Sequence, residues 1–226
     1  MLHIKRAPRQ KLSHRLAQGL LVISFTWACL IWMLPKASAD EAPIEIVALG
    51  DSLTAGYRLA PGDGFVPQLE AHLRARGLNV RVQNGGVSGD TSAGGRARLD
   101  WVLSPNTRAV IVELGANDML RGLSPSLTEQ NLEAILTELQ KRDLPVLLAG
   151  MMAAPNLGSA YARGFNPIYQ KLAEKYNAVY YPFFLEGVAA DRSLNISDGI
   201  HPNRDGIAVI VKNISPSVEK LLARIN

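Results

Sequence analysis

Short apolar segments alternate with amphipathic segments along most of this 226-residue chain, and this alternation restricts its fold more than any other feature. Four segments are runs of mostly apolar residues, three of them followed directly by a glycine, and a fifth is a shorter strand candidate. Runs of this length without a polar face are typical of strands covered on both sides, as in a parallel sheet. The five predicted strands are residues 44–49, 79–83, 109–114, 145–149 and 178–184.

The segments between these strands have a helical pattern. In residues 127–142 the apolar side chains recur at the spacing of one helix face, and Ser126 with Glu129 predicts a capping box at its start. The same spacing from residue 207 onward predicts a further helix, which Pro216 should kink or split. Shorter helices are expected near residues 65–76, 92–103 and 161–176.

Strand and helix thus alternate in the order βαβαβαβαβα. This order predicts a three-layer α/β/α sandwich around a flavodoxin-like, five-stranded parallel sheet. In such sheets, ligands bind beyond the carboxyl ends of the strands. Functional side chains are therefore expected in the residues that follow each strand.

Residues 1–39 differ in composition from the rest of the chain. They hold six of the 24 basic residues and none of the 20 acidic ones, so the remainder carries a net charge of −2. A basic start, the apolar residues 16–34 and Ala37-Ser38-Ala39 form the pattern of a secretory signal peptide cleaved before Asp40. We therefore expect residues 1–39 to be a signal peptide, residues 40–226 to be the functional domain, and the protein to be exported to the periplasm or the medium. Because residues 16–34 are also long enough to cross a membrane, an uncleaved anchor is the alternative, and it would be the protein's only membrane contact.

Charge and residue counts argue against several classes of function. The basic charge lies in the leader rather than in the domain, which argues against a nucleic-acid partner. Cys29 is the only cysteine, so a disulfide framework and a cysteine-based zinc site are both excluded. Only His72 and His201 lie outside the leader, and His72 is expected to be inert on a helix surface. One usable histidine and scattered carboxylates do not make a metal site, so neither a metal nor a cofactor is expected.

Two segments after predicted strands hold residues suited to a nucleophile and a base. Ser52 follows the first strand, where it can present its hydroxyl at the sheet edge; a plain turn with Asp51 or Ser52 as helix cap is the alternative. After the fifth strand come Asp198 and His201, whose spacing lets the carboxylate hold one ring N–H while the other nitrogen faces outward. This is the orientation that a general base for a serine needs.

Two further segments offer hydrogen-bond donors. After the second strand, the glycine-rich residues 84–89 can let backbone N–H groups approach a ligand, although a loop with Asp90 or Thr91 capping a helix explains them too. After the third strand, Asn117 can donate its side-chain amide to an oxyanion, although asparagine is also common in turns. Glu113, inside the third strand, is expected to be buried, hydrogen-bonded and structural.

The four segments GDSLTAGY, SGDTS, ELGANDMLRG and DGIHPNRDG have the order and approximate spacing of the sequence blocks of SGNH, or GDSL-type, hydrolases. The chain from residue 40 onward resembles this family over essentially its whole length. It is most similar to the bacterial periplasmic subgroup of acyl-CoA thioesterase I, lysophospholipase and arylesterase. The resemblance implies a serine hydrolase that cleaves small-molecule acyl esters and thioesters without a metal or cofactor.

The resemblance also implies roles for individual residues. Ser52 would be the nucleophile, His201 the base and Asp198 the carboxylate that orients the base. The oxyanion hole would consist of the backbone N–H groups of Ser52 and Gly89 and the side-chain amide of Asn117.

The acyl-binding residues are expected in two apolar loops, one after the third predicted strand and one after the fourth. The loop after the fourth strand is rich in methionine, whose side chain adapts easily to an irregular surface. Ordinary core packing is the alternative explanation for these residues. The candidate lining residues are Met119, Met151, Met152 and Pro155.

Two other functions fit parts of the same pattern. A carbohydrate O-deacetylase on the same scaffold would keep the triad but would need a polar, aromatic-lined cleft, and aromatic residues make up only 6% of the chain. A non-enzymatic binder of a phosphate ligand would use the glycine-rich loop but would give Asp198 and His201 no role. The sequence makes no prediction of the oligomeric state.

Overall fold

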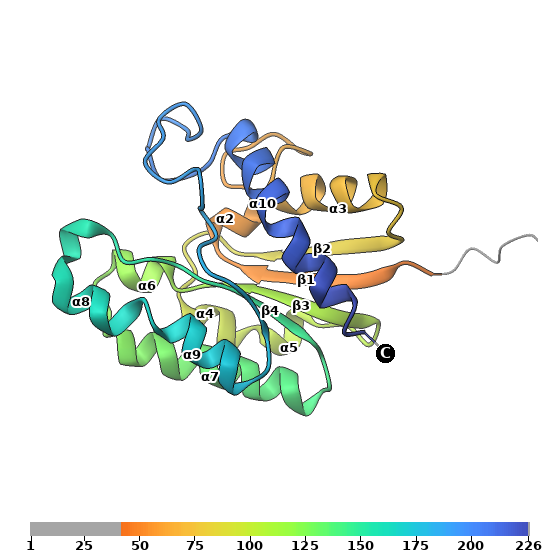
Figure 1. Cartoon of the computed structure of the whole chain (residues 1–226), viewed down its shortest axis with the longest axis horizontal. Coiled ribbons are helices and arrows are strands. Elements are labelled where there is room, and N and C mark those ends of the chain that lie inside the picture. Colours follow the sequence, from red (N-terminus) through yellow and green to blue (C-terminus); the bar gives the residue numbers. More distant parts are fainter. Residues whose placement is uncertain (1–41, 226) are drawn as a thin grey trace, which may run out of the picture. The chain divides into compact units, whose positions relative to one another are not determined.

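Residues 42–225, which the computed structural model describes, form a sheet of five parallel strands in the order β2-β1-β3-β4-β5 (Figure 1). This is the strand order of flavodoxin-like folds. The predicted number of strands and the predicted fold class are therefore confirmed. The strands are β1 (Ile44–Gly50), β2 (Val80–Gly86), β3 (Thr107–Glu113), β4 (Val146–Ala149) and β5 (Val179–Tyr181).

The five strands end level with one another. Gly50 of β1 is in register with Gly86 of β2 and Glu113 of β3. Glu113 is in turn in register with Ala149 of β4, which is in register with Tyr181 of β5. Because these terminal residues lie in one row, the loops that follow the strands leave the same edge of the sheet.

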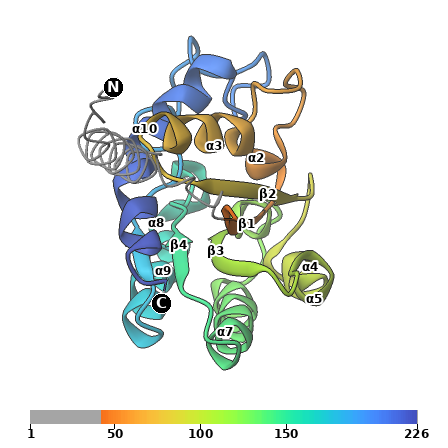
Figure 2. The same ribbon diagram turned by 90° about the vertical axis from the view of Figure 1, so that its right-hand side faces the viewer.

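Helices cover both faces of the sheet and give three layers (Figures 1 and 2). α3 (Phe65–Ala75) and α10 (Arg204–Leu222) pack side by side on one face. The other face carries α4 (Ser92–Ala97), α5 (Leu99–Val102), α7 (Pro125–Lys141) and α9 (Ile168–Lys175). Shorter elements lie in the loops at the carboxyl edge: α2 (Ser52–Ala55), α6 (Ala116–Leu120), the 3-10 turn η1 (Pro155–Leu157) and α8 (Gly158–Phe165).

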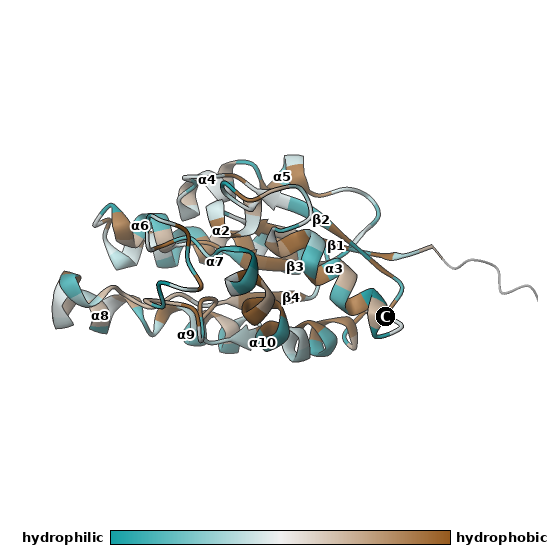
Figure 3. Ribbon diagram, turned by 90° about the horizontal axis from the view of Figure 1, so that it is seen from above, coloured by the Kyte–Doolittle hydropathy of each residue, from teal (hydrophilic) through white to brown (hydrophobic). Residues whose placement is uncertain are grey.

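The central strands are apolar on both faces, as their brown colour in Figure 3 shows. In β1, residues 46–49 are completely buried, and in β3 residues 109–112 are as well. β2 lies at the edge of the sheet, and its side chains alternate between buried and exposed from Val80 to Val82. Burial on one face explains why β2 is the least apolar of the predicted strands.

Two strands end three residues away from the predicted position, and the other three end within one residue of it. β2 continues to Gly86 rather than ending at Gln83. β5 ends at Tyr181, directly before Pro182, because proline has no N–H to donate to a neighbouring strand. The sheet edge is therefore even, although the apolar run of the fifth strand continues past it.

Two predicted helices are each split in two. Residues 92–103 form α4 and α5, and the chain turns between them at Arg98, which caps both. Residues 161–176 form the end of α8 and the whole of α9, with Pro167 between them. Proline cannot donate the N–H that a continuous helix requires at this position.

The predicted capping box at the start of α7 is wrong. The helix begins at Pro125, so Ser124 occupies the N-cap position and Ser126 lies inside the first turn. No side chain caps the helix, and the hydroxyl groups of Ser124 and Ser126 contact each other at 2.8 Å. Pro125 starts the helix because its fixed φ already suits the first helical position.

Pro216 does not split α10, which runs without a break from Arg204 to Leu222. A proline inside a helix costs roughly 3 kcal/mol. Ile214 and Val218, on either side of it, are fully buried, and burying each such side chain contributes about 1.5–3 kcal/mol. Packing of the apolar face therefore outweighs the lost backbone hydrogen bond.

The expectations for residues 1–39, a signal peptide or an anchor, lie outside the described residues. Within residues 42–225, no helix combines the length and the apolar character needed to cross a bilayer.

Candidate active site

Ser52 is the first residue of α2, directly beyond β1. Asp51 is the helix cap, since its Oδ1 accepts the N–H of Leu53 at 3.0 Å. Gly50 must be a glycine, because a Cβ there would lie 2.0 Å from the Oγ1 of Thr54. A tight turn and a capped short helix thus hold Ser52 at the carboxyl edge of the sheet.

A continuous line of hydrogen bonds joins Ser52 to Asp198 through His201. The Oγ of Ser52 lies 2.8 Å from Nε2 of His201, and Nδ1 of His201 lies 2.8 Å from Oδ2 of Asp198. The other carboxylate oxygen of Asp198 accepts the backbone N–H groups of Ile200 and His201, each at 3.0 Å. The turn that carries the imidazole therefore also fixes the carboxylate.

The carboxylate of Asp198 is strongly stabilised in its ionised form. Burial opposes the charge, but the N–H groups of Ile200 and His201 and the imidazole outweigh it and lower the pKa of Asp198 to about 2. An ionised carboxylate beside Nδ1 keeps the ring proton on that nitrogen. Nε2 is then left as the acceptor that faces Ser52.

The His201 ring is held from other sides as well. The Tyr57 ring packs against it at a centroid distance of 4.6 Å and an angle of 41°. The His201 carbonyl accepts the N–H of Ile196 at 2.8 Å, which closes the turn. Just beyond, Asn203 caps α10 by accepting the N–H of Gly206 at 3.0 Å. The imidazole therefore belongs to a segment anchored at both ends.

Two backbone N–H groups, those of Ser52 and Gly89, have no acceptor within residues 42–225. Gly89 has a φ of 86°, and a Cβ there would approach only the Arg121 guanidinium, at 3.8 Å. Arg121 also donates to the Gly89 carbonyl at 2.7 Å, which steadies this loop. Unpaired donors next to open space are what an oxyanion hole requires.

The glycine-rich residues 84–89 were expected to let backbone N–H groups approach a ligand, but Gly85 and Gly86 serve helix packing instead. Both lie in β2, not in a loop. A Cβ on Gly86 would lie 2.3 Å from the backbone nitrogen of Ala55, and one on Gly85 would lie 2.6 Å from Val102. These glycines let α2 and α5 pack closely on the strand, and of the three only Gly89 lies in the loop after β2.

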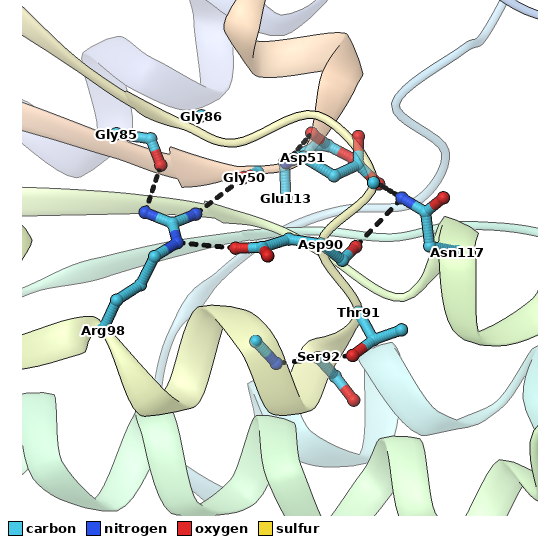
Figure 4. A network of polar contacts seen from close by, with 12 residues as sticks. Gly50, Asp51, Gly85, Gly86, Asp90, Thr91, Ser92, Arg98, Glu113 and Asn117 are labelled. Atoms are coloured by element: carbon cyan, nitrogen blue, oxygen red, sulfur yellow. Dashed lines mark hydrogen bonds and ion pairs between the residues drawn. The ribbon is translucent and has the colours of Figure 1, made fainter.

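The Asn117 side chain, in the first turn of α6, reaches across to the two loops that follow β1 and β2 (Figure 4). Its Nδ2 donates to Oδ2 of Asp51 at 3.0 Å and to the Asp90 carbonyl at 2.9 Å. The amide thus joins three loops at the sheet edge.

Known proteins are similar to this chain in sequence and in fold. Residues 48–209, which include both Ser52 and His201, match the GDSL-like lipase/acylhydrolase family. The chain belongs to this family. With relatives named esterase and thioesterase, it is an ester or thioester hydrolase, and the predicted family and enzyme class are confirmed.

Three of the similar proteins cover nearly the whole domain. Esterase TesA of Pseudomonas aeruginosa is 37% identical over 195 residues, which are 86% of this chain and 96% of that protein. Thioesterase 1/protease 1/lysophospholipase L1 of Escherichia coli K12 is 37% identical over 194 residues, 85% of this chain and 90% of that protein. The crystal structure of AlinE4, an SGNH-hydrolase family esterase, is 50% identical, with a TM-score of 0.68, covering 80% of this chain and 97% of that one.

Glu113 lies beneath the turn that carries Ser52 and is 1% exposed. Its Oε2 accepts the Thr54 hydroxyl at 2.8 Å and, at 3.4 Å, the backbone N–H of Asp51, whereas Oε1 has no partner among the described residues. Burial and then the neighbouring Asp51 carboxylate raise the pKa of Glu113 well above its usual value. These contacts agree with the structural role expected of Glu113, and its raised pKa favours the protonated carboxyl group.

Arg98 fixes the loop that carries Gly89, and no sequence pattern indicated this role. Its guanidinium donates to Oδ2 of Asp90 at 2.6 Å, to the Gly85 carbonyl at 2.7 Å and to the Gly50 carbonyl at 2.8 Å (Figure 4). These bonds attach the loop after β2 to the ends of β1 and β2. Of the two expected helix caps here, Thr91 caps α4, by accepting the N–H of Gly94 at 3.3 Å.

Asp118, the residue after Asn117, anchors α6 from below. It is completely buried, and its carboxylate accepts the Ser92 hydroxyl at 2.5 Å, the Ser92 N–H at 2.7 Å and the Thr128 hydroxyl at 3.2 Å. An acidic residue between Asn117 and the apolar Met119 was the only sequence sign of this role. α6 is thereby held to both α4 and α7.

The four candidate acyl-lining residues divide into two pairs. Met119 and Met151 are 7% and 3% exposed and belong to the core, as the packing alternative predicts. Met152 is 50% exposed, and Pro155 is exposed at the start of η1. Only Met152 and Pro155 can therefore present an apolar surface to a substrate without rearrangement.

Three other titratable side chains form no hydrogen bond with Ser52, Asp198 or His201. His72 is half-buried near the end of α3. Asp191 accepts the Ser193 hydroxyl at 2.6 Å, and Asp205, on the first turn of α10, forms no side-chain hydrogen bond or ion pair with the described residues. No group of three possible metal ligands occurs within residues 42–225.

Proposed function

We propose that this protein is a serine hydrolase that cleaves acyl esters and thioesters, with Ser52 as nucleophile, His201 as general base and Asp198 as the carboxylate that orients it. The observation that carries this proposal is the hydrogen-bonded line from Asp198 through His201 to Ser52, with 2.8 Å at both contacts. These distances allow direct proton transfer. Membership of the acylhydrolase family and relatives named esterase and thioesterase support the same substrate class.

The proposed reaction proceeds through an acyl-enzyme. As Ser52 attacks the acyl carbonyl, His201 accepts the hydroxyl proton at Nε2, and the carbonyl electron pair moves onto oxygen. The N–H groups of Ser52 and Gly89 and the Asn117 amide then stabilise the oxyanion. Its collapse expels the alcohol or thiol, which takes the proton from Nε2. A water molecule, deprotonated by the same nitrogen, then attacks the acyl-enzyme. The second oxyanion collapses, the bond between the acyl carbon and the Oγ of Ser52 breaks, and Oγ takes the proton from Nε2 as the carboxylic acid leaves.

The loops around this site also offer an apolar surface for an acyl chain. Four of the large apolar side chains that are exposed come from loops after β2, β3 and β4 and from the turn before α10. An apolar surface with few polar groups favours an acyl chain over a polyhydroxylated substrate. These side chains are Val87, Leu120, Met152 and Ile200, with exposed fractions of 44%, 56%, 50% and 50%.

No observation favours the two rival functions. A carbohydrate O-deacetylase needs free aromatic faces, but Tyr57 packs on His201 and Tyr161 donates its hydroxyl to the Leu123 carbonyl at 2.9 Å. Trp101 is 91% exposed, but it lies on α5, which leads into the opposite, amino edge of the sheet. A phosphate binder would leave the bond between Asp198 and His201 without a purpose.

A substrate panel tests the proposal. We expect hydrolysis of p-nitrophenyl esters with short and medium acyl chains and of a medium-chain acyl-CoA, and little deacetylation of an acetylated sugar. Preferential deacetylation of the sugar would favour the carbohydrate esterase. No turnover of any member, by a protein that is folded, would contradict the enzymatic role of the triad.

Replacing Asn117 with alanine should lower kcat by about 10²–10³ and change KM little. An oxyanion donor acts mainly on the transition state, and one such donor is worth roughly 2.7–4 kcal/mol. Steady-state kinetics on a p-nitrophenyl ester measures the two constants. Asn106→Ala, an exposed position between α5 and β3, is the matched control and should keep full activity. A raised KM with unchanged kcat would mean that Asn117 only binds substrate.

We also propose that the protein is exported and that its mature form begins at Asp40. A basic start, an apolar run and Ala37-Ser38-Ala39 support this expectation. N-terminal sequencing of protein recovered from the periplasm or the medium should read Asp-Glu-Ala-Pro. Recovery of only the full-length chain in the membrane fraction would instead establish an uncleaved anchor.

A further inference from the structure

Asp51 contacts the proposed oxyanion donor directly, although the proposed triad does not use its carboxylate. Its Oδ2 accepts the Asn117 amide at 3.0 Å, and its Oδ1 accepts the N–H of Leu53 at 3.0 Å. Asp51 is 1% exposed, so water does not compete for either oxygen. The same carboxylate thus fixes the start of the helix that carries Ser52 and the orientation of Asn117 (Figure 4).

The amide of Asn117 has only two N–H groups, and both face protein acceptors. One acceptor is Asp51, and the other is the Asp90 carbonyl at 2.9 Å. Asp90 is itself held by the Arg98 guanidinium at 2.6 Å. Both acceptors are therefore rigid, and the amide plane is fixed before any substrate arrives.

We infer that Asp51 is a positioning residue of the oxyanion hole, which acts on catalysis by holding the side-chain amide of Asn117. This inference rests on the proposed role of Asn117 as an oxyanion donor. Each N–H group of Asn117 already donates a hydrogen bond, one to Asp51 and the other to the Asp90 carbonyl. As charge develops, the oxyanion accepts a further, shared hydrogen bond from one of these N–H groups. A donor that is aimed in advance needs no reorganisation when charge develops.

This arrangement favours the transition state over the ground state. A neutral ester carbonyl is a weaker acceptor than a carboxylate, so it cannot draw the amide away from Asp51. An anionic oxygen can compete, because charge-assisted hydrogen bonds are roughly twice as strong as neutral ones. Asp51 should therefore affect kcat much more than KM.

The electrostatic surroundings keep Asp51 able to accept. Burial raises its pKa to about 6, against the lowering effects of the Leu53 N–H, His201 and the Asn117 amide. At neutral pH it is mostly ionised. The other titratable groups facing it are Glu113 of β3, Asp90 of the loop after β2 and Tyr169 of α9.

A double-mutant cycle tests this inference with Asp51→Ser and Asn117→Ala. Serine is a good helix cap, so Asp51→Ser keeps the start of α2 and removes only the acceptor for Asn117. We expect Asp51→Ser to lower kcat by about 10- to 100-fold, because a misplaced catalytic group can cost up to about 10². In the Asn117→Ala background, the same change should cost less than about 2-fold, because its target is gone.

The other outcomes separate this inference from the function on which it rests. If Asn117→Ala alone keeps full kcat, the proposed oxyanion donor is wrong, and the role of Asp51 is wrong with it. If Asn117→Ala is impaired but Asp51→Ser costs the same factor in both backgrounds, Asp51 acts through the helix or through His201, and only the inference fails. An unchanged kcat in Asp51→Ser also overturns it.

Two further variants control for folding and for charge. Asp51→Asn is isosteric and serves if the serine variant does not fold. When its amide oxygen caps Leu53, its N–H groups face those of Asn117, so we expect the same non-additive loss of kcat. Asp205→Ser, on the first turn of α10, removes a carboxylate that forms no hydrogen bond or ion pair with the described residues, and it should leave kcat unchanged. If Asp51→Asn lowers kcat by the same factor with and without Asn117→Ala, the inference is contradicted.

Discussion

Replacing Ser52 with alanine is expected to abolish hydrolysis and to leave a folded protein. In a serine protease, loss of the nucleophile costs about 2 × 10⁶ in kcat, and a similar loss is expected here. The fold should tolerate the change, because among residues 42–225 the hydroxyl of Ser52 forms a hydrogen bond only with His201, and Asp51 still caps α2. Turnover of a p-nitrophenyl ester and the midpoint of thermal unfolding measure the two effects.

A matched serine provides the control for this variant. Ser217 lies on α10 toward the opposite edge of the sheet and is half-buried. Ser217→Ala should keep full activity and nearly the same unfolding midpoint. If the folded Ser52→Ala protein kept more than about a hundredth of the parent's turnover, another group would have to be the nucleophile.

Asp198→Asn should lower kcat by about 10⁴, the loss found for the equivalent change in a serine protease. The backbone N–H groups of Ile200 and His201 each bind Oδ1 of Asp198 at 3.0 Å, and they would hold the amide oxygen of the new side chain. Its NH₂ group would then face Nδ1 of His201. Nδ1 must then accept a hydrogen bond from this NH₂ group, so the ring proton moves to Nε2. A protonated Nε2 can no longer take the proton of Ser52.

The loss in Asp198→Asn should persist across the pH range. Because the pKa of Asp198 is lowered to about 2, the carboxylate of the parent enzyme is ionised at every pH from 5 to 9. At each pH, His201 therefore has a charged partner in the parent and a neutral partner in Asp198→Asn. The check is kcat/KM of both proteins over this range, with Asp205→Asn as the control that should match the parent. Recovery of activity at high pH would show that Asp198 acts only on the charge of the ring.

The strand order followed from the sequence because each strand is marked by local signals. Apolar runs such as residues 109–112 and the glycines after them mark where the sheet ends, and the alternation with helices allows few topologies. The proposed nucleophile could also be predicted, because it lies directly after β1, and the proposed base and carboxylate because they share one short segment between β5 and α10. Parallel strands with level ends bring such segments together without any further information.

Other features depend on contacts that a single segment does not encode. β2 extends to Gly86 because α2 packs directly on it, and Met119 and Met151 are core residues because of what covers them. The bond between Asp51 and Asn117 joins residues 66 positions apart, and no local pattern announces it. Arg98 is similar, since its three acceptors lie in β1, in β2 and in the loop after β2.

The proposed base and its carboxylate share one four-residue turn, whereas the nucleophile comes from a segment 149 residues away. Two of the three proposed catalytic side chains can therefore come together locally, but they meet Ser52 only when β1 and the segment before α10 have docked on the same sheet. A partly folded chain would hold every residue of the proposed triad and still be unable to hydrolyse an ester. The proposed chemistry therefore begins only when the fold is complete.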